Sequence, residues 1–188
     1  MHDKKKTKEI LIISTLLIML GLLLWVYYSH SKNNLEIQDF SVFCDFETQN
    51  DSSEFLTDNK KYNFSKGLIS KDKFFEGTQS LFIPAWKEFQ NVILLTELTA
   101  NQYVTISFVR NIGSETSIVA QGKVNSDFYV RTNLASTRIN DLWEEVSIKF
   151  TTGNYFKDTL KVYFHNSKKT DTYIDNFSLN VSKTPYYP

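Results

Sequence analysis

Short runs in which apolar and polar side chains alternate are the feature that most limits what this chain can fold into. In "EEVSIKFTT", Val146, Ile148 and Phe150 fall on one side of an extended chain and polar residues fall on the other. The run "TLKVYFHN" repeats the pattern. Because side chains of a strand point alternately to its two faces, this spacing predicts strands with one buried and one solvated face, as in antiparallel sheets.

Similar short runs, alternating or apolar throughout, recur from Gln38 to Val181, and turn-forming residues separate many of them. One of them, "NVILLTEL", is apolar on both sides and predicts a central strand. The 15% content of aromatic residues favours strands as well. We therefore predict an all-β domain built as a sandwich or a barrel of antiparallel sheets.

The N-terminal region carries the pattern of a membrane anchor. An uncharged, largely apolar run extends from Ile10 to Tyr28, about the length that crosses a bilayer core. Lysines at positions 4, 5, 6 and 8 precede it, which predicts a cytoplasmic N-terminus. The expected organisation is a cytoplasmic segment at 1–9, a transmembrane helix at 10–28, a tether at 29–37, the folded domain at 38–182 and a tail at 183–188.

A cleaved signal peptide is the competing interpretation of this region. Its apolar core is normally shorter and ends in a small-x-small cleavage site. Here the run ends in "WVYYSHSKNN", which offers no such site. We favour an uncleaved anchor, with the bilayer as partner of residues 10–28. The folded domain is then expected on the periplasmic side of a bacterial inner membrane.

Charge and cysteine content exclude some classes of function. The 21 basic and 21 acidic residues balance, which argues against a nucleic-acid partner. A single cysteine, Cys44, permits no intramolecular disulfide and no zinc site of the cysteine-cluster type. Since Cys44 has the parity of Phe40, Val42 and Phe46, we expect it to be a small buried apolar residue.

Catalysis is not expected. Of the three histidines, His2 and His30 flank the apolar run, and this leaves only His165 in the folded domain. The sequence contains no G-x-S-x-G elbow, phosphate-binding loop or H-E-x-x-H motif. Glu144 and Glu145 are adjacent, so on a strand they face opposite sides and cannot act as a pair of catalytic acids.

A carboxylate in the last run, "TYIDNFSLNV", needs an explanation. By alternation, Asp175 shares a face with Tyr173, Phe177, Leu179 and Val181. A lone buried charge is costly, so it requires a cation, hydrogen-bond donors or access to water. The residues leave three answers open besides a metal: a turn cap, a β-bulge that carries Asp175 to the surface, or an ion pair with an arginine. The candidate arginines are Arg110, Arg131 and Arg138.

Four segments together resemble a known family. They are "CDFET", "FFEGTQSLFI", "DLWEEVSIKFTT" and the pair "LKVYFHN" and "TYIDNFSL". Their order is similar to that in the galactose-binding-like jelly rolls, in particular the carbohydrate-binding modules appended to xylanases and cellulases. The resemblance implies a two-sheet antiparallel jelly roll whose first and last strands are neighbours, with Trp143 packed in its core.

The resemblance also implies a structural calcium ion. Glu47 matches the early acid of the family and Asp175 the late one, and backbone carbonyls near Gly77 and Ser80 would complete the shell. Calcium takes several oxygen ligands, both carboxylates and carbonyls. Asp45 is a further candidate because it has the parity of Glu47.

A sugar site in this class of module uses exposed aromatic rings with polar groups around them. Each candidate also has a plain alternative as surface or as cover for the core edge. The candidate ligand-binding residues are Trp86, Tyr129, Arg131, Tyr163 and His165.

The expected function is that of a membrane-anchored, extracytoplasmic and non-catalytic binding module, with a glycan as the ligand that the resemblance implies. The alternative is a structural or assembly subunit that docks on another protein of the cell envelope. A third possibility is a spacer that has kept the shape of a glycan-binding module without the activity. The first two differ in a measurable way, since only the former responds to sugars and only the latter co-purifies with a protein partner.

Overall fold

The computed structural model describes residues 18–26, 39–96, 98–124, 127–154, 156 and 158–183. The chain divides into two compact units, Met1–Ile37 and Gln38–Pro188. In the first unit, residues 18–26 form a helix with exposed side chains. Within the described ranges, no helix combines the length and the apolar character that a membrane crossing requires. The rest of the predicted anchor, the tether at 29–37 and the cytoplasmic segment at 1–9 lie outside the described residues.

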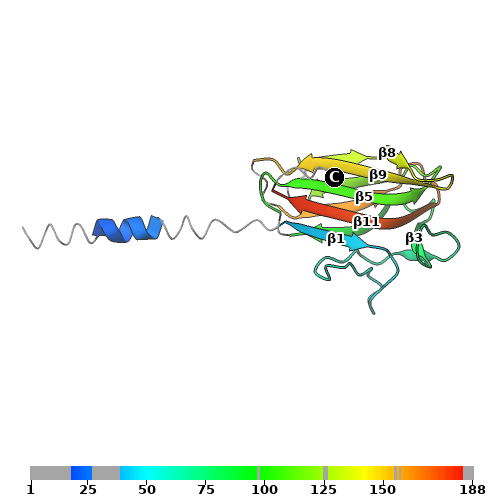
Figure 1. The fold of residues 1–188 in the computed structure, drawn as a ribbon, viewed down its shortest axis with the longest axis horizontal. Helices are drawn as coiled ribbons and strands as arrows, with labels where there is room; N and C mark the ends of the chain where they lie inside the picture. Colours follow the sequence, from blue (N-terminus) through cyan, green and yellow to red (C-terminus); the bar gives the residue numbers. More distant parts are fainter. Residues whose placement is uncertain are drawn as a thin grey trace, which may run out of the picture. The chain divides into compact units, whose positions relative to one another are not determined.

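The second unit is all-β, as the alternating runs predict, and its strands form two sheets (Figure 1). Every pairing between these strands is antiparallel. The strands are β1 (Phe40–Cys44), β2 (Leu68–Ser70), β3 (Ser80–Ile83), β4 (Phe89–Leu95), β5 (Tyr103–Asn111), β6 (Ser117–Gly122), β7 (Tyr129–Thr132), β8 (Ala135–Arg138), β9 (Trp143–Thr151), β10 (Leu160–His165) and β11 (Thr172–Ser182).

The larger sheet has the order β2-β3-β11-β5-β9-β8, with β1 also paired to β11. Figure 1 shows β1, β11, β5, β9 and β8 side by side in this layer. The smaller sheet has the order β4-β10-β6-β7. The pairing of β1 with β11, from Phe40 opposite Val181 to Cys44 opposite Phe177, confirms that the beginning and the end of the domain are neighbours.

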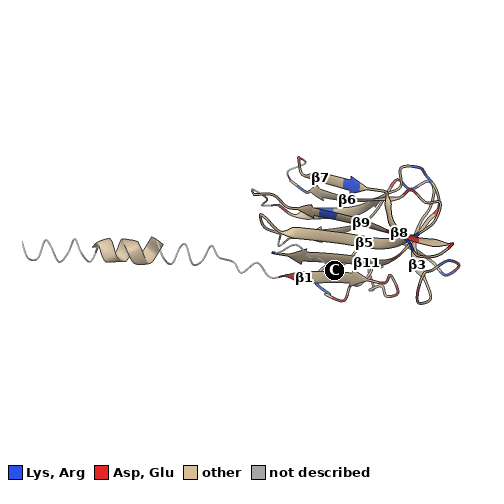
Figure 2. Ribbon diagram, turned by 45° about the horizontal axis from the view of Figure 1, so that its top comes forward, with Lys and Arg blue, Asp and Glu red and all other residues tan. Residues whose placement is uncertain are grey.

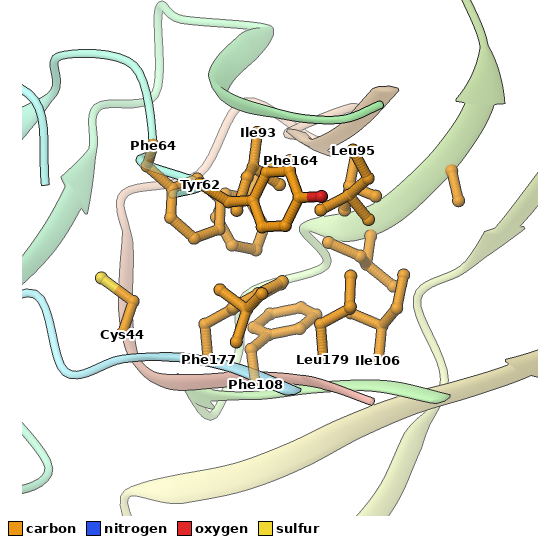
Figure 3. Packing of buried hydrophobic residues seen from close by; sticks show 14 of the residues in the cluster. Cys44, Tyr62, Phe64, Ile93, Leu95, Ile106, Phe108, Phe164, Phe177 and Leu179 are labelled. Atoms are coloured by element: carbon orange, nitrogen blue, oxygen red, sulfur yellow. The ribbon is translucent and has the colours of Figure 1, made fainter. Parts of the chain in front are cut away.

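The core lies between the two sheets (Figure 3). Phe108, Phe177 and Leu179 of the larger sheet face Ile93 and Phe164 of the smaller one in this view. Each of these five side chains is fully buried. Burying one such large apolar side chain contributes about 1.5–3 kcal/mol, so this interface is the main source of the domain's stability. Cys44 is buried in the same cluster, as its parity predicts.

Three details of the strand prediction differ from the structure. The run "NVILLTEL" contributes to β4, which is the terminal strand of its sheet and not a central one. Its double-sided apolar character arises because Val92 and Leu94 lie on the outer face while Ile93 and Leu95 enter the core. The short strands β2 and β8 were not predicted; all residues of β8 are exposed, so no buried face marks it in the sequence.

Candidate functional site

Asp175 does not lie in the apolar row of β11, because a register shift in its pairing with β5 falls between Asp175 and Ser178. Asn176 within this irregularity has a positive φ of 46°. Ile174 before it and Phe177 after it both belong to the core, so the alternation changes phase at the bulge. Asp175 therefore lies on the outer side of the larger sheet, where it is nevertheless fully buried.

The loop between β2 and β3 supplies hydrogen-bond donors to Asp175. Its Oδ2 accepts hydrogen bonds from the backbone N–H groups of Phe75 (2.9 Å) and Glu76 (3.2 Å), and its Oδ1 accepts one from Asn176 (2.9 Å). Burial raises the pKa of Asp175 from 3.8 to about 6, against the three N–H groups, which lower it. Donors, and not an arginine, thus satisfy this carboxylate.

Glu47 binds the same loop a few residues further on. Its Oε1 accepts hydrogen bonds from the N–H groups of Thr78 (2.8 Å) and Gln79 (3.0 Å), and its Oε2 accepts one from the hydroxyl of Thr78 (2.7 Å). Although burial acts in the opposite direction, these donors hold the pKa of Glu47 below its usual value. Gly77 has a φ of +74° and lies against the Glu47 carboxylate, where a Cβ would collide with it.

The other residues of the predicted calcium shell have protein partners too. The hydroxyl of Ser80 donates to the carbonyl of Lys73 (2.6 Å), and Asp45 accepts a hydrogen bond from the N–H of Glu47 (3.0 Å). Calcium is bound by oxygen atoms, whereas N–H and O–H donors surround the Glu47 and Asp175 carboxylates. The described residues include no group of three or more acidic, His or Cys residues that would hold a metal ion. This donor set does not fit a calcium shell, and the calcium itself stays a prediction.

Trp143 is buried, but outside the main hydrophobic cluster. Trp143 has the parity of Glu145 and Ser147, opposite to Val146 in the core, and so lies on the outer side of the larger sheet. Its ring meets Phe75 edge-on, with the ring centroids 5.9 Å apart. The loop that binds both carboxylates therefore also covers Trp143. Trp143 is thus buried, as predicted, but under this loop and not in the main hydrophobic cluster.

Four of the five predicted ligand residues lie on one surface, the outer face of the smaller sheet. Val162 and Phe164 of β10 enter the core, so Tyr163 and His165 point to the other side. On β7, Tyr129 and Arg131 alternate with Val130, which packs against the core. The register places Val119 of β6 between Tyr163 and Arg131, and Gln121 between Lys161 and Tyr129.

These four residues differ in their access to solvent. Tyr129 is 50% exposed and Arg131 is exposed, whereas Tyr163 is 8% exposed. The Tyr163 hydroxyl donates to Gln121 (3.2 Å), and the Lys161 amine lies 4.9 Å from its ring centroid. Burial, together with nearby Tyr129, raises the pKa of Tyr163, while Arg131 acts in the opposite direction. Tyr163 thus forms the floor of the face and does not offer a free ring.

Phe89 is a residue of this face that the sequence interpretation missed. Its ring stacks on the His165 ring, with the ring centroids 4.8 Å apart. The Phe89 side chain is nevertheless 57% exposed. Beside it lies a hollow of about 290 Å³, lined by Phe89, Gln90, Asn91, Val92, Lys161 and Tyr163. The sequence could have indicated Phe89, because this aromatic residue lies only two positions before the apolar run. It was missed because the strand was predicted to begin at Asn91, whereas β4 begins at Phe89.

Trp86 lies outside this sheet face. It follows Pro84 in the turn before β4, where the N–H of Lys87 donates to the Pro84 carbonyl (2.9 Å). The indole is 74% exposed, with the Lys87 amine 5.9 Å from the ring centroid. Trp86 thus lies in a turn between β3 and β4, and the structure does not join it to Tyr129 and Arg131.

Neither a protein-family model nor a curated protein sequence matches this chain. Several solved structures are similar in shape. The xylan-binding domain of family 22 from Paenibacillus barcinonensis is 15% identical over 76% of this chain and 94% of its own, with a TM-score of 0.47. The C-terminal family 22 carbohydrate-binding module of a Clostridium thermocellum xylanase is 17% identical over 77% and 95%, with a TM-score of 0.49.

A cyclase from Fischerella, solved with a bound pyrrolidinylidene-indole compound, is 11% identical over 81% of this chain and 92% of its own, with a TM-score of 0.43. A binding module and an enzyme thus have comparable similarity to this chain. Since sites are grafted on folds, similarity at this level assigns no function. The function has to be argued from the chain's own side chains.

Proposed function

We propose that residues 38–182 form a non-catalytic carbohydrate-binding module of jelly-roll type. The observation that carries the proposal is the outer face of the smaller sheet, where the exposed Tyr129 ring, the exposed Arg131 and the hollow beside Phe89 share one surface. An aromatic ring stacks on the apolar side of a sugar ring, and polar side chains around it bind the hydroxyl groups. Gln121 and Lys161, which lie in the row of Tyr129, supply such polar groups.

A glycan array probed with the full chain in mild detergent tests this function. We expect wild-type protein to bind a subset of glycans and Tyr129→Ala to lose most of that binding. Tyr103→Ala, on the larger sheet, is the matched control and should bind like wild type. If no glycan binds while an envelope protein co-purifies with wild type and not with Tyr129→Ala, the face is a docking surface and the glycan function is wrong.

We further propose that residues 10–28 anchor the module in a bacterial inner membrane, with the N-terminus in the cytoplasm and the module in the periplasm. The support is the lysine cluster before an uncharged run, together with the exposed apolar side chains of the helix at 18–26. Replacing the lysines at positions 4, 5, 6 and 8 by glutamine should reduce the fraction of chains with a periplasmic C-terminus. Protease protection in spheroplasts measures that fraction, with Lys66→Gln and Lys71→Gln as controls.

A further inference from the structure

The strands of the smaller sheet carry cationic side chains on their outer face and no acidic ones. Strands β4, β6, β7 and β10 contain no aspartate or glutamate, whereas Arg131 and Lys161 point outward. Figure 2 shows blue on β7 and no red on β6 or β7. Since the whole chain has equal numbers of basic and acidic residues, this local excess is a property of the face and not of the composition.

The two strong cations of this face have only neutral partners among the described residues. Arg131 donates from Nε to the Ser117 hydroxyl (2.8 Å) and from Nη2 to the Ser167 hydroxyl (3.2 Å). The Lys161 amine lies over the Tyr163 ring. Glu88, directly before β4, pairs with the third basic residue of the face, His165, at 3.3 Å, and among the described residues it forms no ion pair with Arg131 or Lys161.

The other two arginines of the domain are paired with carboxylates, and so is Lys168, whereas lysines such as Lys73, which lies over the Tyr173 ring, are not. Arg110 pairs with Glu144 (2.6 Å), Arg138 with Asp141 (3.0 Å) and Lys168 with Glu115 (2.9 Å). The difference matters because a guanidinium held by two hydroxyl groups keeps its full charge and is already oriented. Such a group binds an added carboxylate, sulfate or phosphate through charge-assisted hydrogen bonds.

Arg131 and Lys161 also lie at a useful separation. One strand, β6, runs between them, and the register offsets them by two residues along it, so their backbones are about 12 Å apart, given a strand spacing of about 4.8 Å and a rise of about 3.4 Å per residue. Tyr129 lies in the row of Lys161, across Gln121, and on the strand of Arg131. An aromatic platform flanked by two cations at this separation fits charged groups on neighbouring units of one chain of sugars.

We propose that the ligand of this face is an acidic glycan, with Arg131 and Lys161 binding its anionic groups and Tyr129 stacking on a sugar ring beside them. The proposal rests on the glycan-binding function and narrows its ligand class. It also explains why the face keeps two unpaired cations, which a site for neutral sugars does not need.

Isothermal titration of the full chain in mild detergent tests the charge requirement. The acidic probes are oligogalacturonate, hyaluronan and dermatan sulfate oligosaccharides. The neutral probes are xylohexaose, cellohexaose and the methyl ester of the oligogalacturonate. We expect an acidic probe to bind at least tenfold more tightly than every neutral one. Arg131→Gln and Lys161→Gln should each weaken that binding by roughly tenfold, since each removes one charge-assisted hydrogen bond.

Arg138→Gln and Lys149→Gln, on the larger sheet, are the matched controls and should leave binding unchanged. Arg131→Lys, which keeps the charge, should retain part of the affinity.

Equal binding of acidic and neutral probes, or unchanged binding in Arg131→Gln and Lys161→Gln, overturns the ligand class and leaves the glycan function standing. Binding of no probe overturns both. A preference for phosphatidylglycerol over phosphatidylcholine vesicles that Arg131→Gln removes, without sugar binding, assigns the face to lipid headgroups and also overturns the proposal.

Discussion

Glu47 and Asp175, from opposite ends of the folded domain, bind consecutive parts of the same loop. Asp175 accepts hydrogen bonds from the backbone of Phe75 and Glu76, and Glu47 accepts them from Thr78 and Gln79. Because β1 and β11 are paired, the two carboxylates approach the loop from adjacent strand ends. This arrangement fixes the loop over the outer side of the larger sheet and leads to specific predictions about stability.

Replacement of Asp175 by alanine should destabilise the domain by about 2–4 kcal/mol. The substitution leaves three N–H groups without their acceptor at a buried site, and a missing partner costs about 1–3 kcal/mol per group before relaxation. Asp175→Asn, which keeps one acceptor oxygen, should cost about 1 kcal/mol. Urea unfolding measures both values, and Asp51→Ala, at an exposed turn, should stay within about 0.5 kcal/mol of wild type. Equal stability of Asp175→Ala and Asp51→Ala contradicts the prediction.

Removal of calcium separates the two explanations of the buried carboxylate. The family resemblance predicts that a chelator lowers the midpoint of thermal unfolding. The N–H donors around Glu47 and Asp175 predict no change, because backbone groups already satisfy the carboxylate oxygens. We expect the same midpoint in EDTA and in millimolar calcium, measured by circular dichroism. A rise of several degrees with calcium that Asp175→Asn abolishes would restore the metal site.

The raised pKa of Asp175 predicts a dependence of stability on pH with a definite sign. Between pH 4 and 6 the folded chain holds a proton on Asp175 that the unfolded chain has released. The contribution of this group is therefore complete below about pH 4 and is lost as the pH rises through about 6. Relative to Asp175→Asn, the free energy of unfolding of wild type should fall by roughly 1–3 kcal/mol over that interval. Urea titrations at each pH measure the difference, and an increase with pH contradicts the assignment.

Glycine at position 77 is required for two separate reasons. Its φ of +74° disfavours any residue with a Cβ, and a Cβ there would also collide with the Glu47 carboxylate. Gly113 offers a matched control, since its φ is +88° and its Cβ position is open. Gly113→Ala should cost about 1 kcal/mol, the price of the backbone conformation alone. Gly77→Ala should cost about 1–2 kcal/mol more, because Glu47 has to move. Equal losses in urea unfolding would show that the contact with Glu47 is unimportant.

The alternation of side chains predicted the buried positions of β1, β9 and β10, because each of these strands has one face in the core. It failed where the backbone departs from a regular strand. The bulge after Asp175 reverses the faces of β11, and no feature of the row of apolar residues indicates it. Alternation also could not distinguish a face covered by a loop, as at Trp143, from a face in the core.

The candidate site shows the same limit. Alternation correctly places Tyr129, Arg131, Tyr163 and His165 on outer faces. It does not predict that the Lys161 amine lies over the Tyr163 ring or that Phe89 stacks on His165. The contact of Phe89 with His165 depends on which strands are neighbours in the sheet. The order of strands in the sheet is a tertiary property, and it decides which side chains remain available to a ligand.

Arg110 connects the larger sheet to the proposed binding face, and its replacement should affect both stability and that face. The guanidinium donates to Glu144 (2.7 Å) and to the carbonyls of Thr116 (2.6 Å) and Asn133 (2.8 Å). Thr116 precedes β6 and Asn133 follows β7, so one buried side chain holds the ends of both strands. A lysine ammonium cannot reach all three acceptors in the planar geometry of the guanidinium, and we therefore expect Arg110→Lys to destabilise the domain by about 2–3 kcal/mol. Hydrogen exchange should show faster exchange of the β6 and β7 amides in this variant than in Arg138→Lys, the exposed control. Unchanged exchange in β6 and β7 would mean that Arg110 does not position the face.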